Sequence, residues 1–432
     1  MSNTVPEGWE KAKFQDVADL IKGLTYSTSD YSSKDSGHPF ITLKCIQKNG
    51  GFSKRGLKYY SGKYKESQTV KAGDVVFANT DLTRDGDVVG SPLLVPKIRS
   101  NKPSLISMDL SKVVPSHGHN GGFIYYWLQT TEVKRQMINL SAGSTVLHLN
   151  TREVPYLCLV VPPLPEQQKI AAVLSSVDDV IEKTRAQIDK LKDLKTGMMQ
   201  ELLTKGIGSG GAPHTEFKDS PVGRIPISWG VAPCGAVCNT ITDGEHLSPK
   251  YVEKGFPILS AKDMRDYGID LGGAKFVAEQ AFTKMLKRCK PEHGDVLIVS
   301  RGATIGKTTL NNCTTPFALM GSVILLKPNQ KCLGEFLSLF IASPFVQQSM
   351  LQLSGSSAQQ AIYLRDIKDM PTPIPPIDEQ KKIAYSIRSI DSRIQALTHK
   401  LNASEDLKKS MMQDLLTGKV RVNVDQKESA VA

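Results

Sequence analysis

Residues 162–171 read PPLPEQQKIA, and residues 375–384 read PPIDEQKKIA. The offset between the two stretches is 213 residues, and the match continues without a gap to residues 204 and 417. Over this length 19 of 43 positions are identical, which chance does not produce. The chain is therefore a long internal repeat.

The match also reaches upstream of these proline-rich hinges. Trp9 corresponds to Trp229 at an offset of 220, and the Gly-Asp-Val triplets at 73–75 and 294–296 correspond at an offset of 221. Between these anchors the two halves diverge almost completely. The repeat therefore predicts that the two halves share one scaffold, and that each half carries a different variable segment.

A long helix is expected after each hinge. Apolar residues recur there in alternating steps of four and three, which is typical of a coiled-coil seam. Residues 166–204, at about 1.5 Å per residue, would span roughly 58 Å. Two-fold pseudosymmetry favours antiparallel packing of the two helices. The predicted seam residues are Ile170, Leu174, Val177, Ile181, Ile188, Ile383, Ile387, Ile390, Ile394 and Leu401.

Polar residues interrupt this seam at Lys195 and Lys408, and also at Thr184 and Ser404. We expect these positions to fix the register of the helices or to leave room for partner subunits. Gly206 and Gly418 suit the C-terminal ends of the two helices.

We predict an α+β fold with two globular domains, two long antiparallel coiled-coil helices and a pseudo-two-fold repeat. Strands are expected at 74–78 and 295–299, and amphipathic helices at 121–140 and 333–353. The predicted segments are a first globular domain 1–161, helix 162–205, linker 206–224, a second globular domain 225–374, helix 375–420 and a flexible tail 421–432.

Composition limits the class of protein. The chain has 432 residues and a formal net charge of +11, which favours a polyanionic partner such as nucleic acid. Its seven scattered cysteines indicate reduced thiols, and no apolar run is long enough to span a bilayer. We therefore expect a cytoplasmic protein.

Catalytic signals are weak. Residues 301–308 read RGATIGKT, but a phosphate-binding P-loop needs a glycine where Arg301 stands and a helix afterwards. The Asp366–Lys368 stretch lacks the further acidic ligands of a metal-dependent nuclease. We predict no catalytic residues, no metal site and no cofactor in this chain.

Two kinds of segment are candidates for contact with DNA: basic stretches, and polar loops after the Gly-Asp-Val strands or before the hinges. Arginine can pair with guanine, and asparagine or glutamine with adenine. The predicted residues are Lys44, Lys54, Arg55, Asn79, Thr80, Thr83, Arg84, Ser144, Thr145, Lys262, Ser300, Arg301, Thr304, Ser357, Gln359 and Gln360.

The paired hinges, the paired MMQxLLT helix ends and the linker FKDSPVGRIP at 217–226 resemble the specificity subunits of type I restriction-modification systems. The likeness covers nearly the whole chain. It implies two target recognition domains, each reading one half of a split, asymmetric DNA site. It also implies helices that separate these domains and bind modification subunits.

The resemblance implies that the catalytic reactions take place on other subunits. Modification subunits would bind S-adenosylmethionine and methylate adenine, and restriction subunits would use ATP and Mg²⁺. The alternatives are the DNA-reading subunit of a related system that cuts on both sides of its site, a structural coiled-coil adaptor, and a self-sufficient nucleic-acid enzyme. Missing catalytic motifs disfavour the last of these.

Overall fold

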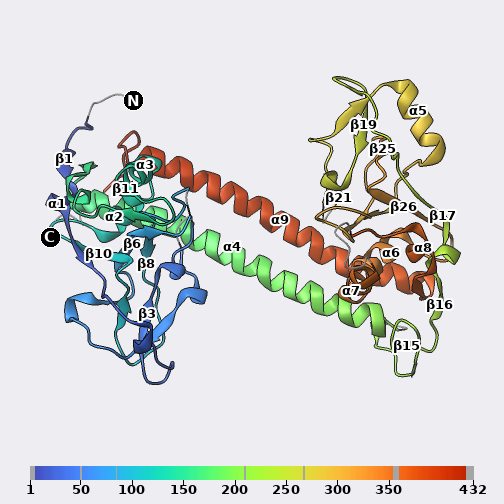
Figure 1. Ribbon diagram of the computed structural model, residues 1–432, viewed down its shortest axis with the longest axis horizontal. Helices are drawn as coiled ribbons and strands as arrows, with labels where there is room; N and C mark the ends of the chain where they lie inside the picture. Colours follow the sequence, from blue (N-terminus) through green and yellow to red (C-terminus); the bar gives the residue numbers. More distant parts are fainter. Residues whose placement is uncertain are drawn as a thin grey trace. The chain divides into compact units, whose positions relative to one another are not determined.

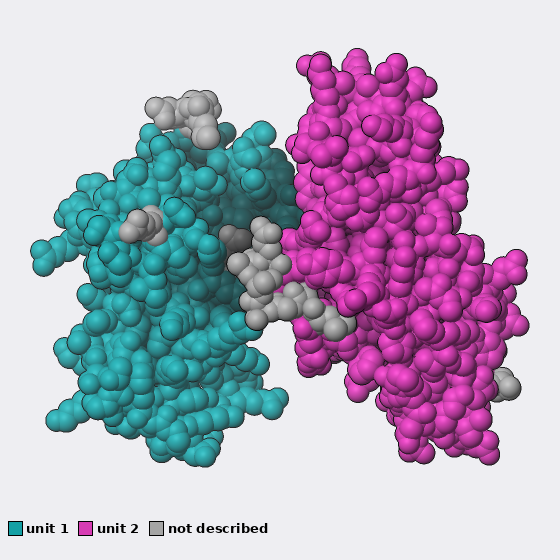
Figure 2. Space-filling model, turned by 45° about the vertical axis from the view of Figure 1, so that its right-hand side comes forward, with its two compact units in different colours: residues 1–184, 400–432 teal, residues 185–399 magenta. Residues whose placement is uncertain are grey.

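The computed structural model describes residues 5–48, 51–83, 85–208, 211–265, 268–353 and 360–424 (Figure 1). The chain forms two compact units (Figure 2): unit 1 comprises residues 1–184 and 400–432, and unit 2 comprises residues 185–399. Within the described ranges, no helix is long and apolar enough to cross a membrane.

Unit 1 contains two four-stranded sheets. The first is antiparallel, in the order β2 (Ala18–Lys22), β10 (Leu110–Pro115), β6 (Val75–Ala78) and β8 (Pro92–Leu94). The second has the order β4 (Lys58–Tyr60), β3 (His38–Ile41), β9 (Ser104–Ile106) and β5 (Thr69–Val70). In this second sheet β3 and β9 run parallel.

Unit 2 repeats this plan. Its antiparallel sheet has the order β17 (Cys238–Asp243), β26 (Val323–Pro328), β23 (Val296–Val299) and β24 (Thr308–Leu310). Its second sheet has the order β18 (Tyr251–Val252), β22 (Lys275–Val277), β19 (Phe256–Leu259) and β25 (Ala318–Leu319), and β19 and β25 run parallel. The predicted strands after the Gly-Asp-Val triplets are the buried β6 and β23.

A two-stranded pair joins the start of each globular segment to its hinge. In unit 1, β1 (Glu10–Lys13) pairs with β13 (Cys158–Val161), and in unit 2, β16 (Gly230–Pro233) pairs with β27 (Pro371–Ile374). Glu10 lies opposite Val161, and Gly230 lies opposite Ile374. These registers combine the offsets of 220 and 213, so the sequence repeat is also a structural repeat.

Two predicted helices are each divided in two, so the prediction of continuous helices was wrong. The first is α2 (Gly121–Leu128) and α3 (Thr131–Asn139), with the Thr130 side chain capping α3. The second is α6 (Gly334–Ile341) and α7 (Pro344–Leu353). Pro344 cannot continue a preceding helix, because it lacks the N–H and its ring clashes with the previous turn.

The two long helices are α4 (Leu164–Lys205) and α9 (Ile377–Leu415). Both are followed by glycines in the left-handed conformation, Gly206 at φ 68° and Gly418 at φ 70°, as predicted. Four of the five seam residues predicted in each helix are buried, whereas Val177 and Leu401 are half-buried.

The helices run antiparallel within each unit. In unit 1 the core combines Ile170 and Leu174 of α4 with Leu415 of α9, and in unit 2 it combines Ile383 of α9 with Leu203 of α4. The early turns of one helix therefore pack with the last turns of the other in both units. This arrangement gives each globular segment the apolar helix surface that it needs to complete its core.

The residues that the two hinges have in common have a structural role. Glu166 accepts a hydrogen bond from Trp9 Nε1 at 3.1 Å, and Glu379 accepts one from Trp229 Nε1 at 3.0 Å. The next residues, Gln167 and Gln380, accept backbone N–H groups of Asn120 and Leu333, both at 2.8 Å. Each hinge thus fastens its globular segment to the start of a long helix.

Candidate nucleic-acid interface

The structure brings two separately predicted loops of unit 1 together. The short strand β7 (Thr80–Asp81), after β6, pairs with β12 (Leu147–Leu149), and β12 pairs with β11 (Ser141–Ala142). The tip of the β11–β12 hairpin carries Ser144 and Thr145, both exposed. The loop after the Gly-Asp-Val strand and the polar segment before the hinge therefore form one site.

Unit 2 has the same junction. Arg301 forms an isolated antiparallel bridge with Ala361, and Ile362 donates its N–H to Ser300 O at 2.9 Å. Ala361 corresponds to His148 at the offset of 213, and Arg301 corresponds to Thr80 at the offset of 221. Arg301, Thr304 and Gln360 are exposed there. The two halves thus present different side chains from equivalent places.

Three predicted DNA-binding residues are buried, which corrects their expected exposure. Asn79 and Thr80 are 4% and 7% exposed, and their side chains donate to Met108 O and Asp109 Oδ1, both at 3.2 Å. Ser300 is 3% exposed and donates to Gly321 O at 3.4 Å. The Asn79 amide N–H and the hydroxyl groups of Thr80 and Ser300 are thus used inside the fold, where these residues support the loops.

The remaining loop predictions have mixed outcomes. Thr83 is half-buried and donates its hydroxyl to Asp81 Oδ1 at 2.8 Å, so it too is engaged within its loop. The predictions at Arg84, Ser357 and Gln359 fall outside the described residues.

The predicted basic residues lie in short 3₁₀ turns. Lys44 is exposed in the turn Leu43–Cys45, and Lys54 and Arg55 are exposed in the turn Lys54–Gly56. Thr42 Oγ1 donates to Gly56 O at 2.8 Å and so links the two turns. Lys262 lies in the turn Ala261–Asp263 after β19, just as Lys44 follows β3. It is exposed and donates to Gly273 O at 3.1 Å.

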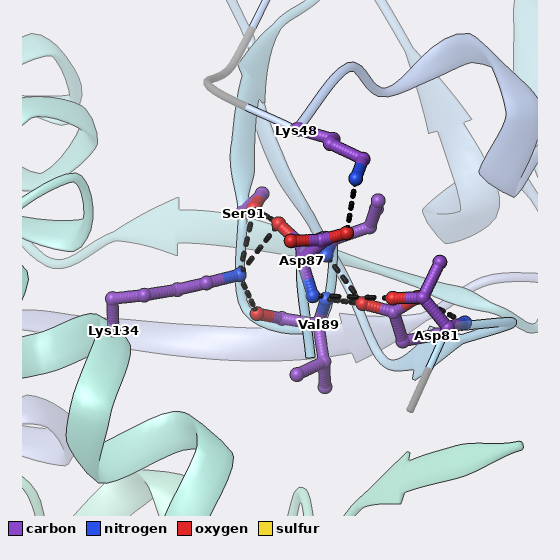
Figure 3. A network of polar contacts seen from close by, with 8 residues as sticks. Lys48, Asp81, Asp87, Val89, Ser91 and Lys134 are labelled. Atoms are coloured by element: carbon purple, nitrogen blue, oxygen red, sulfur yellow. Dashed lines mark hydrogen bonds and ion pairs between the residues drawn. The ribbon is translucent and has the colours of Figure 1, made fainter. Parts of the chain in front are cut away.

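A polar network that was not predicted holds the loop after β7 (Figure 3). Asp81 Oδ2 accepts the N–H groups of Val88 and Val89, the latter at 3.0 Å. Burial alone would raise the pKa of Asp81, but these hydrogen bonds and those from Thr83 outweigh it and lower the pKa. The Asp81 carboxylate therefore stays charged and keeps the loop folded back.

Lys134 of α3 contacts the same loop from the other side (Figure 3). Its Nζ donates to Asp87 O at 3.1 Å, to Val89 O at 2.5 Å and to Ser91 Oγ at 3.0 Å. No sequence motif marked Lys134 or Asp81, because most of their partners are backbone atoms of a loop whose shape only the fold defines.

A cavity of about 320 Å³ adjoins the junction in unit 2. Its lining includes Asp243, Ser300, Arg301, Tyr363 and Arg365. Asp243 is paired with Arg288 at 2.6 Å and with His246 at 2.8 Å. Within the described ranges, the Arg301 and Arg365 side chains make no ion pair. Two unpaired guanidinium groups beside a cavity favour an anionic ligand such as a DNA phosphate.

Comparisons with known proteins agree with this duplicated layout. The family model described as type I restriction modification DNA specificity domain matches twice, over residues 6–193 and 214–404. A protein of Methanocaldococcus jannaschii assigned as its type I restriction enzyme MjaX specificity subunit is 27% identical, covering 97% of this chain and 95% of that protein. The Escherichia coli type I restriction enzyme EcoBI specificity subunit is 23% identical, with coverage of 92% and 82%.

A solved structure gives the same fold. The crystal structure of the S subunit of a type I restriction-modification system from M. genitalium superposes with a TM-score of 0.64 at 16% identity, covering 96% of this chain and 97% of that one. Because the family model matches nearly the whole chain, once in each half, this chain belongs to the family of type I restriction-modification DNA specificity proteins.

Proposed function

We propose that this chain is the non-catalytic subunit that selects the DNA site of a type I restriction-modification complex. Each globular segment reads one half of a split, asymmetric site. The long helices set the spacing between the halves and dock two modification subunits. S-adenosylmethionine, ATP and Mg²⁺ act on partner subunits, and this chain chooses where they act.

One observation carries the proposal: equivalent junctions in the two units present different side chains. At the position where unit 1 has the buried Thr80, unit 2 has the exposed Arg301. A duplicated frame with unlike loops is what two half-sites of different sequence require, since base edges are read by specific donors and acceptors.

Repetition of the helices supports two identical partners. The Asp178–Lys408 ion pair of unit 1 and the Asp391–Lys195 pair of unit 2 join positions related by the offset of 213. Two equivalent helix surfaces suit two copies of one modification subunit. A structural adaptor with no DNA role would have no need of unlike, arginine-bearing loops.

The test is co-expression with the adenine methyltransferase subunit of the same system, followed by mapping of methylated adenines across genomic DNA. We expect a split motif with a fixed gap that disappears when this chain is omitted. Methylation that is unchanged without this chain, or a continuous palindromic motif, would contradict the proposal.

A further inference from the structure

The loops after β6 and β23 are closed in the same way. Gly90 donates its N–H to Ala78 O at 2.8 Å, and Gly306 donates its N–H to Val299 O at 2.8 Å. Ala78 and Val299 are the last residues of β6 and β23, and both glycines have left-handed φ, 72° and 83°. The described residues between Ala78 and Gly90 and those between Val299 and Gly306 therefore belong to equivalent loops of different length.

A side chain from a helix fixes each closing point. In unit 1 Lys134 of α3 donates to Val89 O, next to Gly90. In unit 2 Gln347 of α7 donates its Nε2 to Gly306 O at 2.9 Å and to Ile341 O at 2.8 Å. Lys134 and Gln347 are related by the offset of 213, and both are half-buried.

We propose that Lys134 and Gln347 are equivalent positioning residues, each of which holds the DNA-reading loop of its own unit in its reading conformation. This inference rests on the proposed function. Neither side chain itself needs to touch DNA, because the donors of both are used within the protein, on the loop closure and, for Gln347, also on Ile341 O of α6.

The chemistry of the two side chains fits the two loops. An ammonium group has three donors, and Lys134 uses them on Asp87 O, Val89 O and Ser91 Oγ. An amide has two donors, and Gln347 uses both. Removal of either side chain takes donors away from partly buried carbonyls, although Gly306 O keeps the Thr308 hydroxyl at 3.0 Å. Loss of either side chain therefore favours an open loop.

The charged surroundings of Lys134 distinguish it from Gln347, its equivalent in unit 2. Asp81 and Asp87 attract the ammonium group, and Asp87 is itself paired with Lys48. Gln347 carries no charge. The two reading loops thus have the same anchor position with different chemistry, and each can be disturbed without touching the other.

The experiment compares Lys134→Met with Gln347→Met in the full chain, co-expressed with the modification subunit on a plasmid library randomised at both half-sites. Controls are Arg135→Met and Gln348→Met, at the neighbouring positions, which are exposed; Arg135 pairs with Glu132. Each test variant should accept non-cognate bases roughly ten times more often, in one half-site only, and the two should affect opposite halves. The controls should keep the wild-type motif.

Rescue separates positioning from general stabilisation. Lys134→Arg, which keeps the charge and the donors, should retain the wild-type motif, and it also serves if Lys134→Met does not fold. Relaxation of both half-sites by one variant, no relaxation in soluble complexes, or loss of the motif in Lys134→Arg would each overturn the inference. If the wild-type complex itself shows no split motif, the proposed function fails instead.

Discussion

The Lys408 ammonium of α9 lies 2.7 Å from the Asp178 carboxylate of α4, and its repeat equivalent, Lys195, lies 2.6 Å from Asp391. Each pair joins the late turns of one helix to the early turns of the other within one unit. The lysines that interrupt the apolar seam are therefore matched to aspartates, and the pairs specify antiparallel register.

Lys408→Met should destabilise unit 1 by about 1–3 kcal/mol, because the pair is largely buried and Asp178 would lose its cation. The exposed neighbour Lys409 provides the control variant Lys409→Met. Urea unfolding should show a lower midpoint for Lys408→Met only. Equal midpoints in the two variants would show that the pair contributes nothing to stability.

Glu379 is expected to be sensitive to substitution, because it is a buried carboxylate near the start of α9. Its carboxylate accepts from Trp229, His214 and the backbone N–H of Ile207. Glu379→Gln would turn an N–H₂ group toward these donors and should cost roughly 2–3 kcal/mol. Thermal unfolding of this variant is compared with that of Glu182→Gln, an exposed position of α4. A similar unfolding midpoint for both variants would show that the hydrogen bonds accepted by Glu379 do not stabilise the fold.

The stability that Lys134 contributes should depend on pH. Burial lowers its pKa to about 8 despite the attraction of Asp81 and Asp87, whereas an unfolded lysine titrates near 10.5. Between these values the unfolded chain binds more protons than the folded chain, so stability rises with pH. The urea midpoint of the wild type relative to Lys134→Met should be higher at pH 9.5 than at pH 7.5. A relative midpoint that falls over this range would contradict the assignment.

Gly90 should tolerate no side chain. Its φ is left-handed, and a Cβ there would lie 2.7 Å from Met137 Cβ. Gly73 is also left-handed but has open space around it. Gly90→Ala should therefore cost more than the ~1–2 kcal/mol backbone strain expected for Gly73→Ala. The difference between the thermal unfolding midpoints of the two variants measures the contribution of the steric clash. Equal losses of stability would show that the clash with Met137 contributes nothing.

Arg301→Ala tests how unit 2 contacts DNA. Arg301 is exposed at the junction, beside Arg365 and a cavity. If it reads a base edge, the variant should relax one position of one half-site by about 1–3 kcal/mol. Binding assays with DNA substituted at single positions measure this. Uniform weakening across all sequences, with a shallower salt dependence, would assign Arg301 to a phosphate instead.

Much of the scaffold could be predicted because it depends on local patterns that occur twice. The heptad spacing from Ile170 and from Ile383 predicted the long helices, and Gly206 and Gly418 marked their ends. The Gly-Asp-Val triplets located β6 and β23. Thr130 and Pro344, which divide the shorter helices, were visible in the sequence but were outweighed by the apolar pattern around them.

Residue-level features of the candidate interface depended on tertiary structure. The sequence by itself determined the duplication, the helix seam and the general positions of the loops, because periodicity and offsets are properties of the chain alone. Only the fold decided that Asn79, Thr80 and Ser300 turn inward. Only the fold placed Lys134 and Gln347 on the loop carbonyls. The reason is physical: backbone carbonyls have no sequence signature, and their partners are chosen by proximity in three dimensions.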